Sequence, residues 1–260
     1  MSLRSRSINR MRHVLEPSGE AALAAVLRRS PLLGFDFDGT LAPIVSTPEQ
    51  ARVSRSVSDK LRRLSARLPV AIVSGRSATD VRRRLDFEPY CVIGNHGADA
   101  GSEPADEVTE SLEGVRRSLS ANAQALLHAG VNVEDKGLSI ALHYRLSRKP
   151  LQSAALIDEI LRDAATGCAI FAGKMVVNVV PGGVPDKGTA MHQLVRRCGA
   201  ACAFYVGDDG NDESVFNSAP PEWLTVRVGR HDPASRAHYF IDSTAEVGML
   251  LDRLVVHSGA

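Results

Sequence analysis

Residues 33–41 read LGFDFDGTL, an apolar run that ends in two carboxylates, Asp36 and Asp38. Side chains two positions apart on a strand point to the same face of a sheet, so these two acids face the same way. The end of a buried parallel strand is also the edge at which open α/β sheets bind their ligands. The stretch therefore predicts an α/β fold with an acidic site where its first buried strand ends.

Two like charges side by side are costly unless a cation or a shared proton offsets them. Mg²⁺ suits this position, because it prefers oxygen ligands and often takes only one or two carboxylates together with waters and phosphate. The alternative is an Asp-Gly turn, in which Asp38 only shapes the chain. The rest of the chain decides between the two.

Strand and helix patterns alternate over residues 31–97. Apolar runs at 32–38, 69–76 and 90–97 have the length of strands. Between them lie an amphipathic stretch with Val57, Leu61, Leu64 and Leu68 on one face and a segment, 77–85, that opens with a Ser77–Asp80 capping-box pattern. A first helix is expected over 20–29. This alternation indicates a parallel sheet that is covered on both faces.

The middle of the chain follows another pattern. It predicts a helix over 105–129, a hairpin around Lys136-Gly137, a helix over 151–167 and a second hairpin joined by Ala172-Gly173. Alternation then resumes with a helix over 186–199, a strand over 201–209, a short helix over 211–217 and a last helix from Ser243. We therefore expect a tail and helix (1–30), a core in two segments (31–100 and 184–260) and an inserted α+β domain (101–183).

Polar side chains also follow the later strands of the predicted core. Ser74 and Arg76 end the strand at 69–76, and Ser74 is less easily read as a helix cap than Ser77. Lys187 opens a helix, where a cation is unfavourable for the helix dipole, so phosphate binding explains it better than local structure does. Three further acids follow the strand at 201–209, and the last is also read as a first-turn helix acid: Asp208, Asp209 and Asp212.

Taken together, DxDGT, a strand-ending serine, a lysine and GDDxxD resemble the haloacid dehalogenase-like phosphatases. The resemblance implies a Rossmann-like core with an inserted cap, Asp36 as nucleophile and Asp38 as general acid and base. It implies that Ser74 and Lys187 hold the phosphoryl oxygens. It also implies a Mg²⁺ site built from Asp36, Asp208 and the backbone carbonyl of Asp38, with Asp209 and Asp212 nearby.

Five stretches resemble trehalose-6-phosphate phosphatases more closely: DFDGTLAPIV (36–45), VAIVSGR (70–76), IGNHGAD (93–99), VEDKGLSIALHYR (133–145) and VGDDGNDESVF (206–216). This implies sugar contacts from a set of polar residues in the core and the inserted domain: Arg76, Asn95, His96, Glu134, Lys136, Lys174 and Asn178. Alternative interpretations without a role in binding exist for residues of the first predicted hairpin. His143, Tyr144 and Arg145 could belong only to the framework of the inserted domain, and Glu134 could be a solvated acid.

One stretch departs from the family pattern. Where that pattern reads GKxVxExRP, residues 173–181 read GKMVVNVVP, so Asn178 stands for a glutamate and Val180 for an arginine. Asparagine keeps a hydrogen-bonding carbonyl but loses the charge. Either the sugar is therefore expected to bind more weakly or the preferred sugar is expected to differ, whereas the core chemistry should be unaffected.

We therefore expect a Mg²⁺-dependent phosphatase that cleaves trehalose 6-phosphate through an aspartyl-phosphate. The alternatives are a related phosphatase for another sugar, a sugar phosphotransferase or mutase that uses the same intermediate, and a non-catalytic sensor. The sensor is the least favoured, because binding alone needs no nucleophile paired with an acid.

Composition narrows the setting of this 260-residue chain. A net charge of +1 gives no case for nucleic-acid binding, and no stretch is long and apolar enough to span a membrane. The four cysteines show neither CxxC spacing nor a disulfide framework, which favours a reduced, cytoplasmic setting. The Arg- and Ser-rich start (1–15) is read as a disordered tail rather than a transit peptide. The only expected partner is a small sugar phosphate, with a monomer as the working assumption.

Overall fold

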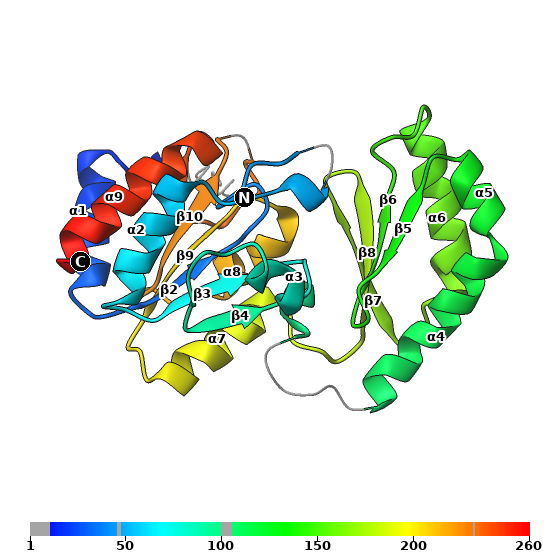
Figure 1. Cartoon of the computed structure of the whole chain (residues 1–260), viewed down its shortest axis with the longest axis horizontal. Coiled ribbons are helices and arrows are strands. Elements are labelled where there is room, and N and C mark those ends of the chain that lie inside the picture. Colours follow the sequence, from blue (N-terminus) through cyan, green and yellow to red (C-terminus); the bar gives the residue numbers. More distant parts are fainter. Residues whose placement is uncertain (1–10, 46–47, 100–105, 231) are drawn as a thin grey trace, which may run out of the picture.

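The computed structural model describes residues 11–45, 48–99, 106–230 and 232–260. Within these ranges the chain forms a seven-stranded parallel sheet, the core sheet, and a four-stranded antiparallel sheet, the cap sheet. Figure 1 shows them side by side, with the cap sheet between the core and a layer of helices. The α/β core with an inserted cap is the fold class that the sequence predicts.

The first predicted strand lies in the interior of the core sheet. Strand β2 (Leu32–Phe35) pairs with β9 (Ala203–Gly207) on one side and with β3 (Val70–Val73) on the other. Every residue of these three strands is buried, because helices cover both faces of the sheet. The order continues outward through β4 (Cys91–Ile93) on one edge, and through β10 (Leu224–Val228), β11 (Tyr239–Ile241) and β1 (Arg12–His13) on the other.

Helices α1 (Pro17–Leu27), α2 (Arg55–Ser65) and α9 (Val247–Ser258) pack together on one face of the core sheet. Helices α7 (Lys187–Cys198) and α8 (Glu213–Ser218) cover the other face, and the short α3 (Ala78–Arg82) lies beside β4. Asp186 caps α7 by accepting a hydrogen bond from the Thr189 amide, and Gly199 ends it in the left-handed conformation. The capped start of α7 fixes the position of Lys187 beneath the sheet edge.

The cap has a hydrophobic core of its own. Helices α4 (Asp106–Ala121), α5 (Ala123–His128) and α6 (Pro150–Ala164) pack on one face of a sheet ordered β5 (Asn132–Asp135), β6 (Ile140–His143), β8 (Val176–Pro181) and β7 (Cys168–Gly173). Val177 and Val179 of β8 belong to this core. Because side chains alternate along a strand, Asn178 and Val180 point to the opposite face, toward the core sheet. Phe171 of β7 lies directly opposite Asn178.

Two predicted cap elements differ from the structure. The helix expected over 105–129 is broken at Asn122, whose backbone leaves the helical region and whose side chain donates to the Ser118 carbonyl. Such local side-chain bonds compete with the helical ladder. The second hairpin turns at Lys174 and Met175, not at Ala172-Gly173, because Met175 takes the positive φ of 64° and Gly173 pairs with Val176.

The N-terminal tail prediction is wrong in part. Residues 1–10 lie outside the described ranges, but Arg12 and His13 pair in parallel with β11. No element is predicted over 219–242, where β10 and β11 lie. The run LTVRV of β10, bounded by prolines and a glycine, carried a strand signal, whereas β1 and β11 are too short to show one.

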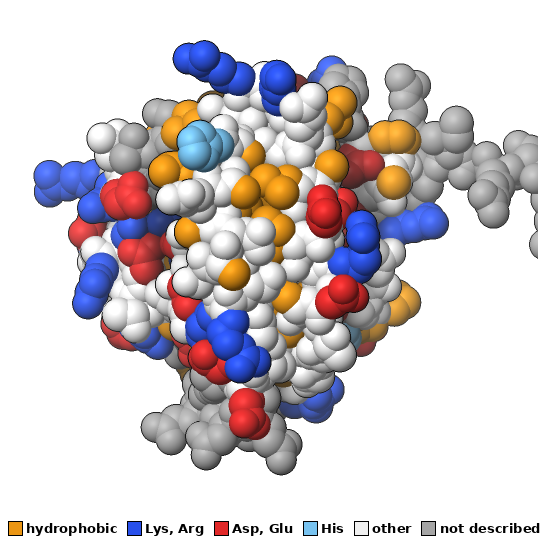
Figure 2. Space-filling view, turned by 90° about the vertical axis from the view of Figure 1, so that its right-hand side faces the viewer, with side chains coloured by type: hydrophobic (Ala, Val, Ile, Leu, Met, Phe, Trp, Pro, Cys, Tyr) orange, Lys and Arg blue, Asp and Glu red, His pale blue; other side chains and the backbone are white. Residues whose placement is uncertain are grey.

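The outer face of the cap helices mixes both signs of charge around scattered apolar side chains (Figure 2). Leu127 of α5 and Leu151 of α6 are the most exposed large apolar residues of these two helices, at 76% and 88%. Within the described part of the chain, none of the helices is long and apolar enough to cross a membrane.

Candidate active site

Asp36 and Asp38 follow β2 in the interior of the core sheet. The Asp36 amide extends the strand ladder by donating to the Val206 carbonyl at 2.9 Å, and the Asp36 side chain is buried. The chain then turns at Gly39, whose φ is +81°. A Cβ at Gly39 would lie 2.3 Å from Oδ2 of Asp208, so only glycine lets this turn approach the second acidic strand end so closely.

Lys187 joins the two predicted halves of the site. Its side chain is 1% exposed, and its ammonium donates to Oδ1 of Asp36 at 2.8 Å and to Oδ1 of Asp212 at 2.7 Å. Burial lowers the pKa of Lys187, but the two carboxylates outweigh it, and the net shift is upward. Lys187 therefore stays charged beside Asp36, where it can neutralise an incoming phosphoryl group.

Asp212, the most ambiguous acid in the sequence, is fully buried and has three donors. Besides Lys187, the Tyr205 hydroxyl donates to Oδ1 at 2.7 Å and the Asp209 amide donates to Oδ2 at 2.9 Å. Tyr205 is a member of this cluster that sequence reasoning missed. Its only signal was a hydroxyl inside the apolar run of β9. Together these donors hold Asp212 in place as the second partner of Lys187.

The carboxylate oxygens of Asp36, Asp208 and Asp212 lie within 4.8 Å of one another. Burial raises the pKa of Asp36 well above its usual value, and the Asp212 and Asp208 charges add to the rise, while Lys187 opposes it. Burial likewise raises the pKa of Asp208 to about 6, although Lys174 opposes the rise. Hard oxygen donors that carry more negative charge than the buried lysine offsets fit a divalent cation such as Mg²⁺.

The two other predicted metal ligands lie outside this group in the described structure. Asp209 caps the 3-10 turn Gly210–Asp212 by accepting from the Gly210 amide at 2.8 Å. The Asp38 carboxylate accepts two hydrogen bonds from Arg76, at 2.7 and 2.8 Å. The arrangement therefore favours Asp36 and Asp208 as the carboxylate ligands, with Asp212 committed to Lys187.

In this structure the Arg76 guanidinium is bound to the Asp38 carboxylate. The guanidinium also pairs with Asp80 at 2.9 Å and lies over the Phe37 ring, and the Arg76 amide donates to Oγ of the buried Ser74 at 3.1 Å. In this structure Arg76 positions the predicted acid and base, and its predicted contact with substrate remains a prediction.

Three cap residues reach the core. The Lys174 ammonium pairs with the Asp208 carboxylate, Lys136 donates to the Gly75 carbonyl at 3.0 Å, and Ser139 donates to Oδ1 of Asn95 at 2.8 Å. Ser139 had no predicted role. These contacts place the predicted cap lysines at the edge of the core sheet that carries the acids.

The other polar cap residue, Glu134, lies beside Lys136. Its carboxylate is 3.0 Å from Nε2 of His143 and 3.7 Å from the Lys136 ammonium. The hydrogen bond with His143 lowers the pKa of Glu134, so its charge is retained at neutral pH.

Asn95 and His96 occupy a strained turn after β4. Both have positive φ, 49° and 61°, which is uncommon for residues other than glycine. Both are buried, and His96 packs edge-on against the Phe171 ring with centroids 4.8 Å apart. Both also line a cavity of about 350 Å³ between the cap and the core, with Lys187 in its wall. The GNHG motif thus faces the side of the cap that carries Asn178.

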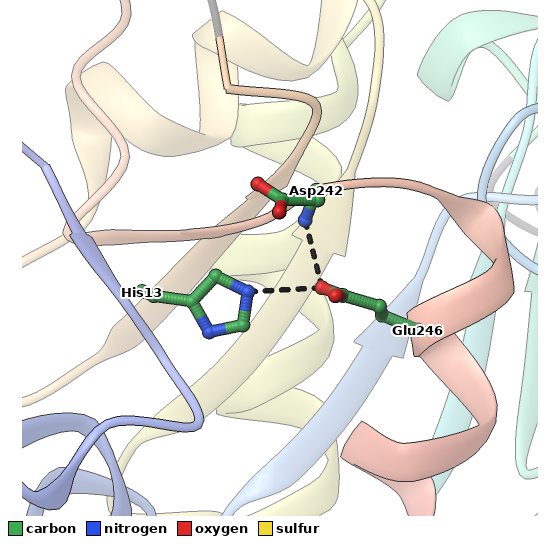
Figure 3. A group of neighbouring side chains, drawn as sticks. All are labelled: His13, Asp242 and Glu246. Carbon is green, nitrogen blue, oxygen red and sulfur yellow. Dashed lines mark hydrogen bonds and ion pairs between the residues drawn. The ribbon is translucent and has the colours of Figure 1, made fainter.

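A second group of possible ligands lies at the far edge of the core sheet, among His13, Asp242 and Glu246 (Figure 3). Nε2 of His13 and the Asp242 amide both meet the Glu246 carboxylate, at 2.9 and 2.8 Å. Nδ1 of His13 accepts a hydrogen bond from the Leu15 amide, and the Arg230 guanidinium donates to the Asp242 carboxylate. Because these atoms already have partners, we interpret the group as a tie between β1 and the start of α9.

The parallel core sheet with its inserted cap defines the fold class of the haloacid dehalogenase-like hydrolases. A hydrolase of that description from B. subtilis superposes with a TM-score of 0.59 at 16% identity, covering 85% of this chain and 98% of its own. Within this class, the chain belongs to the trehalose-phosphatase family, whose model matches residues 34–243.

Curated relatives have similar identities but are longer. A trehalose-phosphate phosphatase of Mycolicibacterium paratuberculosis is 31% identical over 245 residues, which is 87% of this chain and 62% of that protein. An uncharacterized glycosyl hydrolase of Mycobacterium tuberculosis is 31% identical over 242 residues, 87% of this chain and 18% of that protein. The chain thus spans between about a fifth and three fifths of the length of these relatives.

Among solved structures, the C-terminal domain of the C. albicans trehalose-6-phosphate phosphatase superposes with a TM-score of 0.77 at 22% identity. It covers 96% of this chain and 98% of its own. At this identity the likeness shows the fold.

Proposed function

We propose that the protein is a Mg²⁺-dependent phosphatase that hydrolyses trehalose 6-phosphate to trehalose and phosphate. The observation that carries this proposal is the buried group of Asp36 and Asp208, at the ends of β2 and β9, with Lys187 at the start of α7. In the proposal, this group supplies a carboxylate nucleophile, a cation and two hard oxygen ligands. Family membership supports the phosphatase class, and the names of the relatives support the sugar.

In the first half of the reaction, an Asp36 oxygen attacks phosphorus and the bond from phosphorus to the sugar oxygen breaks. The phosphoryl group becomes bound to Asp36 as an aspartyl-phosphate, and the leaving oxygen takes a proton from Asp38. Lys187, 2.8 Å from Asp36, neutralises the phosphoryl oxygens. The buried Ser74 hydroxyl is proposed to bind one of these oxygens.

In the second half, Asp38 accepts a proton from water, which attacks phosphorus and releases phosphate from Asp36. The two hydrogen bonds from Arg76 hold the Asp38 carboxyl group in position for both proton transfers. Mg²⁺, which we propose is held by Asp36, Asp208 and the Asp38 carbonyl, would neutralise charge that develops on the phosphoryl oxygens. Asn95 and His96 line the cavity between cap and core, and Lys136 and Lys174 contact the core. These four, with Glu134 and Asn178 of the cap sheet, are proposed to bind the sugar.

Asn178 and Val180 keep a second candidate open, namely a phosphatase for another sugar phosphate. Both residues are buried on the face of the cap sheet that points toward the core. A neutral amide and an apolar side chain there offer the sugar fewer strong hydrogen bonds than charged groups would. The cytoplasmic setting and the monomeric state belong to the same proposal. All four cysteines are free thiols, which agrees with a reduced compartment.

The test is phosphate release from a panel of sugar phosphates, with Mg²⁺ and with a chelator. Wild-type protein should release phosphate from trehalose 6-phosphate only with the metal, and Asp36→Asn should release none. Equal kcat/KM on glucose 6-phosphate and trehalose 6-phosphate would refute the narrow substrate assignment. Transfer of the phosphoryl group to a second sugar without free phosphate would instead support a phosphotransferase. Undiminished release by Asp36→Asn would refute the mechanism.

A further inference from the structure

We propose that the cavity between strand β7 and the 3-10 turn Gly210–Asp212 binds the sugar ring of the substrate, and that Asn211 and Phe171 select it. This inference rests on the proposed function and adds residues to it, because neither Asn211 nor Phe171 was predicted to contact substrate. The cavity measures about 350 Å³, at the lower end of the range of ~300–1,000 Å³ that is typical of ligand sites.

The walls of the cavity are mostly apolar. On the cap side they include Ala169, Phe171 and Val180, which share one face of the cap sheet, and Pro181 follows at the end of β8. A pyranose has apolar faces made by its C–H groups and a polar edge made by its hydroxyls. A flat aromatic ring beside small aliphatic side chains therefore suits the face of a sugar, provided that the edge finds polar partners.

Those partners are two buried atoms, Nε2 of His96 and Oδ1 of Asn211, neither of which has a hydrogen bond of standard geometry among the described residues. His96 is 8% exposed, and both residues line the cavity. Nδ2 of Asn211 donates to Nδ1 of His96 at 3.2 Å, which leaves the proton of a neutral imidazole on Nε2. Burial, together with the Lys187 and Lys136 charges, lowers the pKa of His96 and keeps the ring neutral, although a hydrogen bond with the Asn178 side chain opposes the fall.

The cavity therefore offers one free acceptor, Oδ1 of Asn211, and beside it the Nε2–H of His96, which lies close to the Asn178 side chain. A hydroxyl group can both accept and donate, so sugar hydroxyls at this end would satisfy both atoms. Leaving such atoms unpaired is costly in a buried site, which makes this pair a means of discrimination. Lys187 lines the same cavity while its ammonium holds Asp36, so a sugar bound here lies next to the proposed nucleophile.

The experiment compares wild type with Asn211→Ala, Asn211→Ser and Phe171→Leu on two substrates. Trehalose 6-phosphate carries the sugar, whereas glycerol 2-phosphate carries a phosphoryl group without a ring. The ratio of kcat/KM for trehalose 6-phosphate to that for glycerol 2-phosphate should fall about tenfold or more in the Asn211 variants, because a buried partner is lost. It should also fall in Phe171→Leu, which keeps an apolar side chain but removes the ring.

Monodeoxy analogues of trehalose 6-phosphate give the sharper readout. One analogue should react about tenfold or more slowly than the parent with wild type, but at the same rate as the parent with Asn211→Ala. Ile170→Ala is the matched control. Ile170 neighbours Phe171 on β7, pairs with Val179 rather than Asn178 and is 46% exposed. This variant should leave both kcat/KM values unchanged, and thermal unfolding should verify that all variants fold.

The outcomes separate the two proposals. If wild type cleaves trehalose 6-phosphate but the substrate ratio and the deoxy profile are unchanged in the folded Asn211 and Phe171 variants, the cavity is not the sugar site and the proposed function stands. If wild type cleaves glycerol 2-phosphate but no sugar phosphate, both proposals are overturned.

Discussion

At the scale of single residues, the stability of the site depends on how its buried charges are paired. Asp36, Asp212 and Lys187 are all nearly inaccessible to water, and the ammonium of Lys187 pairs with both carboxylates. A buried ion that loses its partner is strongly destabilising, even where the pair itself contributes little net stability. Residues of this cluster are therefore expected to affect folding as well as chemistry.

Asp212 gives the clearest case. Asp212→Ala leaves the buried Lys187 with Asp36 alone and removes the acceptor of Tyr205, so the free energy of unfolding should fall by about 3–5 kcal/mol. Tyr205→Phe removes one hydrogen bond to Asp212 and should cost only about 1 kcal/mol. Urea denaturation of both variants measures the difference. Equal losses would show that Asp212 does not hold Lys187.

The raised pKa of Asp208 predicts that the stability of the chelator-treated protein depends on pH. This pKa is raised from 3.8 to about 6 in the folded state, so the folded protein holds this proton more tightly than the unfolded chain does. Its contribution to stability is therefore lost as pH rises from about 4 to about 6, and it is constant above that. Wild type should lose stability relative to Asp208→Asn across this window in denaturant titrations. A constant difference between the two proteins would contradict the shift.

The same proton would compete with the proposed Mg²⁺ for the Asp208 carboxylate. Mg²⁺ needs the ionised carboxylate, so the apparent affinity for Mg²⁺ should rise with pH until about 6 and then level off. Calorimetric titration of the chelator-treated protein with MgCl₂ at several pH values measures this. An affinity that falls as pH rises through the window would exclude Asp208 as a ligand.

The sequence predicted the charged members of the cluster better than their partners. Asp36, Lys187 and Asp208 stand where apolar patterns end, so their meeting followed from the topology of a parallel sheet. Tyr205 and Asn211 had no such signal, because their roles depend on which side chains the fold brings against them. Arg76 shows the same limit: its position at a strand end was visible, but its pairing with Asp38 and Asp80 was not.

At the scale of elements, the turn after β2 decides how closely the two acidic strand ends approach. Gly39→Ala would strain a residue at φ +81° and drive a methyl group into the Asp208 carboxylate. We expect Mg²⁺ affinity to fall at least tenfold, as measured by calorimetry. Gly199→Ala is the control, since Gly199 has φ +68° and a Cβ there meets no atom of the described chain within 4 Å. It should lose stability, because of the positive φ, without losing affinity.

The elements themselves were predictable in proportion to their length and burial. Strands β2, β3 and β9 are continuous apolar runs, so the pattern alone located them. Strand β1 has two residues and depends on pairing with β11, which no local pattern reveals. The break at Asn122 was also hidden, because the apolar periodicity continues past it into α5, where Leu126 is buried.

At the scale of the whole molecule, the tie at His13 joins the start of the described chain to its last helix (Figure 3). His13→Ala removes the hydrogen bond to Glu246 and the edge contact with Phe240. We expect the free energy of unfolding to fall by about 1–2 kcal/mol in urea titrations, with kcat unchanged. The tie is on the opposite edge of the sheet from β4, so a change in kcat would show that it communicates with the site.

The path of the chain through the two sheets has a consequence for how such an enzyme can be altered. Asp36 precedes the cap in the sequence, and Lys187 and Asp208 follow it. The proposed reactive centre is therefore assembled from the two core segments on either side of an inserted domain that has its own hydrophobic core. The cap can therefore be exchanged, by evolution or by design, between the same two junctions with the core. Under the proposed function, such an exchange would change the choice of sugar and leave the residues proposed to break the phosphate ester unchanged.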